Sequence, residues 1–404
     1  MPDLELLSPA GDMESLRAAL RFGADAVYAG GPMLQLRAGS AGFDMDALAQ
    51  AAREVHAQGK KLYVAVNAFP TTRELEALGD YAQALSDLGA DAVIAADPGV
   101  IATVRRAAPR LAVHVSTQAN CMNSAAARIY WDMGATRIVL ARELTLEDIA
   151  ELRARTPAAL ELEAFVHGAM CMAYSGRCLI SAYLTGRSAN RGGCAQPCRW
   201  RYHLVKQTRP GEFFPVEEDT DGATLLSARD LNCLDFLDRL ADAGVTSFKI
   251  EGRMKSPYYV ATVTGAYRRR IDALPDGPLQ PQALAALQRE LNAVSHRAYC
   301  SGFYFGGMQD QAPDGGAYLQ DCRFVGTVSQ RLSGGRVRVE LRNRIAEGDV
   351  IEVVSPRLLG LAFAAAAMTD TAGEPVRVAD VPRRFYDMDA PESVRPGDLL
   401  RVRL

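Results

Sequence analysis

Residues 5–31 read ELLSPAGDMESLRAALRFGADAVYAGG, which is an apolar run, an amphipathic segment and a second apolar run in close succession. The segment MESLRAALRFGA has helical periodicity, and Gly23 is typical of a helix end just before a buried strand. Two strands joined by a helical crossover pair in parallel. This stretch therefore predicts one strand–helix–strand unit of a parallel sheet.

The same unit repeats along most of the chain, up to about residue 273. Eight apolar runs alternate with helical patterns, and eight strands close a (β/α)8 barrel. We therefore expect an α/β fold, a TIM-like (β/α)8 barrel, over residues 1–275. A doubly wound open sheet is the alternative, although no GxGxxG or Walker motif supports it. The expected strands begin at Leu4, Asp25, Lys61, Asp91, Leu111, Arg137, Leu160 and Thr246.

The repeat is interrupted once, after the seventh expected strand. Residues 171–222 form a cysteine-rich insertion at the C-terminal end of that strand, which is the face where barrel active sites lie. A helix is expected next, over residues 228–245. A helical connector should occupy residues 276–320, and short alternating strands separated by turn signals predict a small antiparallel β-barrel domain over residues 321–404.

Composition limits the class of protein. The chain has 404 residues, 49% hydrophobic and 23% charged, so it can bury a large core and is neither disordered nor of low complexity. No signal peptide and no apolar run of about 18–20 residues is present, so we expect a cytoplasmic protein with no membrane partner. The net charge of −3 offers no general attraction to a polyanion, so any nucleic-acid contact must be local.

Charged residues alternate along the last two expected barrel strands, where period two places them on one face. The apolar face must meet the helices, so the charged face should point into the barrel, and buried charges must pair or line a cavity. One reading is an internal salt-bridge network, for example Glu163 with Lys249. The other is a polar pocket in which Lys249 and Arg253 hold an anionic substrate. The candidate catalytic residues on this face are Glu163, His167, Lys249, Glu251 and Arg253.

Polar side chains at the ends of three other strands converge on the same expected mouth. Asn67 ends the third strand and Arg142 the sixth, while His114, Ser116 and Gln118 lie along the fifth. Five converging polar positions favour a ligand site at the barrel mouth. Asn67, Gln118 and Arg142 are therefore candidate substrate-binding residues.

Four of the eight cysteines lie close together, with the spacing C-x6-C-x15-C-x3-C. In a reducing cytosol this density favours a metal site over disulfides. The last pair alone fits a zinc knuckle, four thiolates also suit an iron–sulfur cluster, and free thiols remain a third possibility. Cys233 is a possible substitute ligand, but it is expected on an amphipathic helix with its side chain in the protein core. Cys121, Cys300 and Cys322 are expected to be buried small hydrophobes. The candidate ligands are Cys171, Cys178, Cys194 and Cys198.

The cysteine insertion is also locally basic. No Asp or Glu occurs between Ala164 and Pro210, and the Arg and Lys residues there are interleaved with Tyr and Trp. Such a stretch resembles a nucleic-acid contact surface, where Arg meets phosphates and rings stack on splayed bases. Alternatively, the Arg residues compensate the charge of four thiolates. Arg187, Arg191 and Trp200 are the candidate substrate-binding residues of this stretch.

Residues 163–200, EAFVHGAMCMAYSGRCLISAYLTGRSANRGGCAQPCRW, closely resemble the signature of the collagenase-like peptidase family. The opening stretch at 5–31 and SFKIEGRMKSPYYV at 247–260 resemble it too, so the resemblance covers essentially the whole chain. The understood members of that family are hydroxylases of RNA or of quinone precursors. They are similar in depending on prephenate, in not needing oxygen and in carrying a [4Fe–4S] cluster on four cysteines. The resemblance therefore implies that Cys171, Cys178, Cys194 and Cys198 hold such a cluster.

The resemblance also implies a substrate. The branch most similar in length and in the CAQPC–RW motif converts the wobble uridine of tRNA to 5-hydroxyuridine, so the expected partners are tRNA, prephenate and iron–sulfur assembly proteins. A branch that hydroxylates a cytidine of 23S rRNA is an alternative, although its members are generally longer. A peptidase or collagenase is a second alternative, but the chain has no HExxH motif and no Ser or Cys beside an assignable base. A non-catalytic iron–sulfur RNA-binding factor is a third.

Overall fold

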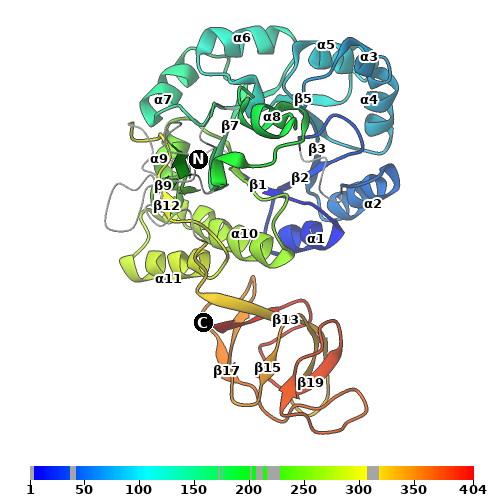
Figure 1. Ribbon diagram of the computed structural model, residues 1–404, viewed down its shortest axis with the longest axis vertical. Coiled ribbons are helices and arrows are strands. Elements are labelled where there is room, and N and C mark those ends of the chain that lie inside the picture. Colours follow the sequence, from blue (N-terminus) through cyan, green and yellow to red (C-terminus); the bar gives the residue numbers. More distant parts are fainter. Residues whose placement is uncertain are drawn as a thin grey trace.

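Eight parallel strands close into a barrel in the computed structural model (Figure 1), which describes residues 4–36, 42–171, 173–174, 176–200, 203–205, 213–215, 228–306 and 318–404. The last strand closes the ring by pairing with both the first and the seventh, at Glu5↔Ser247 and Ser247↔Glu163. The barrel strands are β1 (Glu5–Pro9), β2 (Ala26–Gly30), β3 (Lys61–Val66), β4 (Ala92–Ala95), β5 (Ala112–Val115), β6 (Arg137–Val139), β7 (Glu161–Ala169) and β11 (Ser247–Ile250). The eight-stranded prediction is confirmed.

Helices surround the strands as an outer ring (Figure 1). Several of them begin where a side chain caps free backbone N–H groups, for example at Asp12, whose carboxylate accepts from the backbone N–H of Ser15. Apolar faces of the helices pack on the strands, and a single large core results. The ring comprises α1 (Met13–Arg21), α2 (Met45–His56), α3 (Thr72–Leu75), α4 (Leu78–Asp87), α5 (Pro98–Ala107), α6 (Ser124–Asp132), α7 (Leu146–Ala154), α9 (Leu237–Asp242) and α10 (Pro257–Asp272).

The insertion after β7 contains α8 (Ile180–Thr185), two 3-10 turns, η2 (Ala189–Arg191) and η3 (Pro197–Arg199), and the hairpin of β8 (His203–Val205) with β9 (Phe213–Pro215). In Figure 1, α8 lies inside the ring of helices, across the end of the barrel. No helix among the described residues is both long and apolar enough to cross a lipid bilayer.

The helix expected over residues 228–245 is wrong at its start. Residues Asp230–Asn232 form β10, a 3-10 turn follows, and only Leu237–Asp242 is α-helical. The reason lies in β7, which runs past the barrel and offers its backbone to β10, with Leu231 opposite Gly168. The short strand β12 (Tyr299–Cys300), which follows α11 (Pro281–Asn292), then pairs with β10.

The C-terminal region is antiparallel, as predicted, and has its own small core. Six strands form an open half-barrel in the order β17 (Ala362–Ala364), β16 (Val350–Val354), β20 (Leu399–Arg403), β13 (Cys322–Arg331), β14 (Arg336–Leu341) and β19 (Phe385–Asp389), and β15 (Ile345–Ala346) pairs with β18 (Val378–Ala379). The region is joined to the barrel by stacked rings and ion pairs. The ring of Tyr258 on α10 stacks on that of Phe324 on β13, with centroids 5.0 Å apart, and Arg401 of β20 forms an ion pair with Glu290 of α11.

Candidate active site

A cavity of about 160 Å³ lies at the C-terminal end of the barrel strands, beneath the cysteine insertion. Barrel side chains and insertion side chains line it together, which is the convergence that the sequence predicted. From the barrel come Asn67, Ser116, Gln118, Arg142, Lys249, Glu251 and Arg253, and from the insertion Cys171, Cys178, Cys194 and Cys198.

An ion pair forms part of the barrel interior at this cavity. Lys249 Nζ donates to Glu163 Oε1 at 2.6 Å, and both side chains are almost fully buried. Arg137 adds a second bond to Glu163 at 3.0 Å, so the buried carboxylate is doubly compensated. Burial lowers the pKa of Lys249, and the Glu163 carboxylate opposes that shift. The salt-bridge reading of the charged face is therefore confirmed for Glu163 and Lys249.

Arg253 is held by a side chain that sequence reasoning missed. Its Nη1 donates to Gln35 Oε1 at 3.0 Å, and Gln35 Nε2 donates to the carbonyl of Gly31 at 2.8 Å. The contact requires glycine at position 30, because a Cβ there would lie 1.8 Å from Gln35 Oε1. The sequence holds one signal that could have identified Gln35: it is a polar residue soon after the second barrel strand, as Asn67 is after the third.

Two buried polar atoms of cavity-lining residues have no hydrogen-bond partner among the described residues. They are Asn67 Oδ1, an acceptor, and Arg142 Nε, a donor. The rest of Arg142 is fixed, because Nη1 donates to the Ala169 carbonyl at 2.8 Å and the guanidinium lies 3.9 Å from the Phe165 ring centroid. Buried polar atoms are normally satisfied, so the two atoms offer one acceptor and one donor to a polar ligand or water.

His167 does not face the barrel interior, so the prediction of its face is wrong. Lys249 pairs with Phe165 but Ile250 pairs with His167, so Val166 is an extra residue in β7 and the alternation of faces reverses there. His167 packs instead against the rings of Tyr259, Tyr267 and Tyr299, on the outer side of the barrel wall. Burial lowers its pKa to about 3.

His114, the other histidine expected at the mouth, lies inside the barrel but does not line the cavity. Its ring packs edge-on against Tyr63, with centroids 4.6 Å apart. Burial and the nearby cations Arg137 and Lys249 hold the pKa of His114 well below its ordinary value. It is therefore a neutral interior side chain.

The four candidate ligand cysteines are not joined in disulfides, and they reach the cavity from two parts of the insertion. The backbone N–H of Gln196 donates to Cys194 Sγ at 3.4 Å. Gly176 sits against the backbone of Gln118, where a Cβ would lie 2.3 Å from the carbonyl oxygen, so the loop between Cys171 and Cys178 is seated directly on the barrel.

The donor set fits a thiolate-bound metal centre, because four thiols and three cationic side chains share one cavity. Within the described ranges, however, no three Cys, His, Asp or Glu side chains are already arranged around a common point that could hold a metal ion. Of the remaining cysteines, Cys121, Cys233 and Cys322 are buried as expected. Cys300 is only partly buried, so that expectation is wrong, because the two-residue strand β12 leaves it near the surface.

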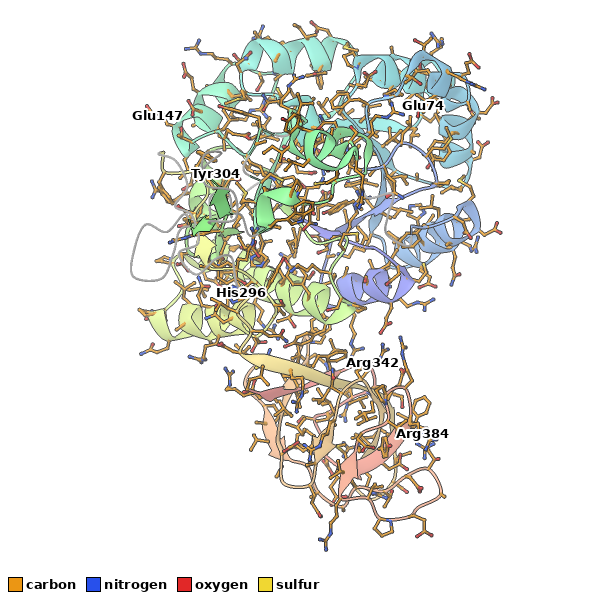
Figure 2. All side chains as sticks on the ribbon, in the orientation of Figure 1. Glu74, Glu147, His296, Tyr304, Arg342 and Arg384 are labelled. Carbon is orange, nitrogen blue, oxygen red and sulfur yellow. The ribbon has the colours of Figure 1, made fainter. Side chains whose placement is uncertain are left out.

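Only part of the basic stretch can be placed. Arg201, Tyr202, Lys206 and Arg209 lie outside the described residues, as does the side chain of Arg199. Arg187 and Trp200 are exposed, as an RNA contact requires. Arg191 is exposed too, but its Nη2 bonds Glu74 (Figure 2) at 2.7 Å and its Nη1 donates to the Phe69 carbonyl at 3.2 Å, so it fastens the insertion to the barrel.

Comparison with known proteins follows the same division of the chain. Residues 11–313 match the family described as "Peptidase family U32", and residues 320–401 match "Peptidase family U32 C-terminal domain". The chain belongs to peptidase family U32. Every barrel and insertion residue that lines the cavity falls within the first U32 match.

Three curated U32 relatives have names of different kinds. The "tRNA hydroxylation protein P" of Escherichia coli (strain K12) is 36% identical over 93% of this chain and 91% of its own length. The "23S rRNA 5-hydroxycytidine C2501 synthase" of the same organism is 41% identical, over 67% of this chain and 40% of its own length. The "Collagenase" of Porphyromonas gingivalis (strain W83) is 35% identical over 75% of this chain and 74% of its own.

Proposed function

We propose that this U32 chain is an RNA-modifying enzyme that hydroxylates the wobble uridine of tRNA to 5-hydroxyuridine, without molecular oxygen. The observation that carries the proposal is the single cavity shared by four insertion thiols and the cationic barrel mouth. The name of the E. coli relative, which matches nearly the full length of both chains, supports tRNA as the substrate. The rRNA synthase matches over only 40% of its length, so it supports RNA hydroxylation more than it supports rRNA as the target.

A peptidase is less well supported by the cavity. Hydrolysis by a Ser or Cys nucleophile needs an adjacent base, commonly a histidine. Among the described residues that line the cavity there is no histidine, since His114 lies deeper in the barrel and His167 lies outside its wall. The collagenase relative is therefore a weaker guide to this site than the hydroxylation protein.

The proposed cofactor is a [4Fe–4S] cluster held by Cys171, Cys178, Cys194 and Cys198. When bound, such a cluster supplies electron transfer or Lewis acidity at the edge of the cavity. The chain's own contribution is to offset the thiolate charge with the nearby side chains of Arg142 and Arg253. The backbone N–H of Gln196 donates a hydrogen bond that would stabilise a thiolate at Cys194.

The proposed co-substrate is prephenate, which carries two carboxylates and a hydroxyl. Arg142 is suited to bind a carboxylate, because it lines the cavity and its Nε lacks a partner among the described residues. Arg253, oriented by Gln35, is suited to bind the other. Asn67 Oδ1 is an acceptor for the hydroxyl. Lys249 is assigned a smaller role, because Glu163 already balances its charge.

Proton transfer at the uridine is assigned to Glu251. It is the one acidic side chain among the described residues of the cavity lining, and Tyr28 Oη donates to its Oε2 at 3.3 Å. Positioned carboxylates act as general acids or bases when they reach the reacting atom. Glu163 and His167, which the sequence also put forward as catalytic, are structural in this arrangement.

Reconstitution tests the proposal. Anaerobically purified, iron-loaded protein should convert unmodified tRNA to a product that contains 5-hydroxyuridine only when prephenate is added, as measured by nucleoside mass spectrometry. Omitting prephenate, or replacing Glu251 by Gln, should abolish the product. A hydroxylated cytidine in rRNA fragments, or cleavage of a gelatin substrate without RNA modification, would instead support one of the alternatives.

A further inference from the structure

The outer side of α8 exposes large apolar side chains in a way that core packing does not explain. Tyr183 is 88% exposed and Leu179, just before the helix, is 71% exposed, while Leu184 is 46% exposed. The opposite side of the helix is occupied, because Ser181 is fully buried and its hydroxyl accepts a hydrogen bond from the backbone N–H of Ala195 at 3.0 Å. Ile180, the first residue of the helix, lines the cavity. The helix therefore lies between the cavity and solvent. Clustered exposed apolar side chains mark contact surfaces.

The surroundings of this surface are aromatic and cationic. Tyr174 is half-exposed before α8, and Trp200 is 44% exposed after η3, which packs against α8. Arg177 and Arg187 are both exposed on the same insertion. No acidic residue occurs from Ala164 to Pro210, so a polyanion meets no repulsion from this segment.

We infer that Leu179, Tyr183 and Leu184 form a stacking platform for unpaired bases of a single-stranded RNA loop. The inference rests on the proposed function and adds which structural form of RNA is recognised. A duplex hides the faces of its bases, so it could not use a protruding tyrosine ring, whereas loop bases can stack on one. The cations nearby match phosphates of the same loop.

The position of the platform above the cavity gives it a specific task. A base that enters a cavity beneath the insertion must leave its stack, which costs a few kcal/mol, and the neighbouring bases lose a stacking partner. Tyr183 is exposed on the helix whose first residue, Ile180, lines that cavity. It can therefore replace the lost stacking for the nucleotide that remains outside.

The test compares two RNA forms and three variants by fluorescence anisotropy. One probe is a hairpin with a seven-nucleotide loop, and the other contains the same stem as an uninterrupted duplex. Replacing Tyr183 by Ala should weaken hairpin binding roughly ten- to hundredfold, with an unchanged salt slope and unchanged duplex binding. Tyr183→Phe should restore most of the affinity, because the ring is kept. Phe385→Ala, at a 42% exposed ring on β19, is the matched control and should bind both probes like wild type.

The outcomes distinguish failure of the stacking platform from failure of the proposed hydroxylation. Equal loss on hairpin and duplex, no loss at all, or wild-type protein that binds neither RNA would overturn the platform; the last result would point to a protein partner for α8. Iron content measured on the same samples shows whether Tyr183→Ala disturbs the insertion. Because binding is measured without turnover, selective hairpin loss in a protein that fails to hydroxylate tRNA would sustain the platform while refuting the proposed reaction.

Discussion

Lys249 and Glu163 form a buried ion pair of 2.6 Å at the centre of the barrel, beside the cavity that the four cysteines reach. The pair separates two roles that charged strand residues can have. Charges that are paired within the barrel stabilise the strands, whereas Arg142 at the mouth, whose Nη1 donates to the Ala169 carbonyl, can offer its charge to a ligand.

Replacing Lys249 by Met should therefore lower the free energy of unfolding, and it should affect prephenate affinity less. Removing one partner of a buried pair costs about 3–5 kcal/mol, and Arg137 keeps the loss toward the lower end because it still bonds Glu163. Denaturant unfolding measures the change. The double variant Lys249→Met with Glu163→Gln should regain part of the loss. Arg155→Gln, which breaks an exposed pair with Glu151, should change the free energy of unfolding by less than about 1 kcal/mol.

Ligand binding should depend on Arg253 and on the residue that orients it. Arg253→Gln and Gln35→Leu should each weaken prephenate binding about ten- to hundredfold, since a hydrogen bond to a charged group contributes about 1.5–3 kcal/mol. Isothermal titration calorimetry with prephenate measures this effect. Iron content should be unchanged in both variants. If Gln35→Leu binds prephenate like wild type, Gln35 does not position Arg253 for the ligand.

Metal content should follow the four cavity cysteines. Purified without oxygen, the protein should be brown and contain iron and sulfide near cluster stoichiometry. The Cys194→Ala and Cys198→Ala variants should be colourless. The Cys300→Ala variant should stay brown, because Cys300 lies on β12 and does not line the cavity. A colourless protein with one zinc ion would refute the cluster.

Stability should fall in acid because of His167. Its pKa is about 3 when folded, below an ordinary value near 6.5, so the unfolded chain binds a proton first as pH decreases. Between about pH 6.5 and 3 this histidine should remove about 1.4 kcal/mol of stability per pH unit, and above pH 6.5 it should have no such effect. His167→Gln should show a correspondingly shallower decline in denaturant titrations at pH 6.5, 5.5 and 4.5. Equal slopes for both proteins would contradict the assigned burial.

Two arginines of the insertion should behave differently towards RNA. Arg187→Gln should lower the salt slope of log K for tRNA by about 0.7–0.9, as loss of one phosphate contact does. Arg191→Gln should leave the slope nearly unchanged and instead make the insertion more sensitive to proteolysis, because Arg191 bonds Glu74 and the Phe69 carbonyl. Identical slope changes in the two variants would show that Arg191 also reaches phosphate.

The strands of the barrel could be predicted because each is a buried apolar run that a helical repeat follows, as in residues 5–31. The two features that the sequence did not predict depend on how strands pair. The direction of His167 follows from an extra residue in β7 that only the register with β11 reveals. Likewise, β10 forms from a helical-looking sequence because an extended β7 is beside it.

The site could be predicted where it depends on strand ends, because parallel strands deliver their C-terminal residues to one place. Asn67, Arg142 and Arg253 were found in this way. Partners distant in sequence could not be found. Glu74 is 117 residues from Arg191, and Gln35 is 218 residues from Arg253, so the local sequence pattern predicts neither contact.

The bonds between the C-terminal half-barrel and the (β/α)8 barrel also determine how the chain melts. Asp398, fully buried, bonds Arg21 of α1, and Arg401 bonds Glu290 of α11. Leu399 of β20 belongs to the large barrel core and not to the smaller one. Losing the C-terminal strands would leave apolar surface and charged groups of the barrel without partners. The two domains should therefore unfold in one cooperative calorimetric transition, and a barrel cut off at residue 320 should aggregate.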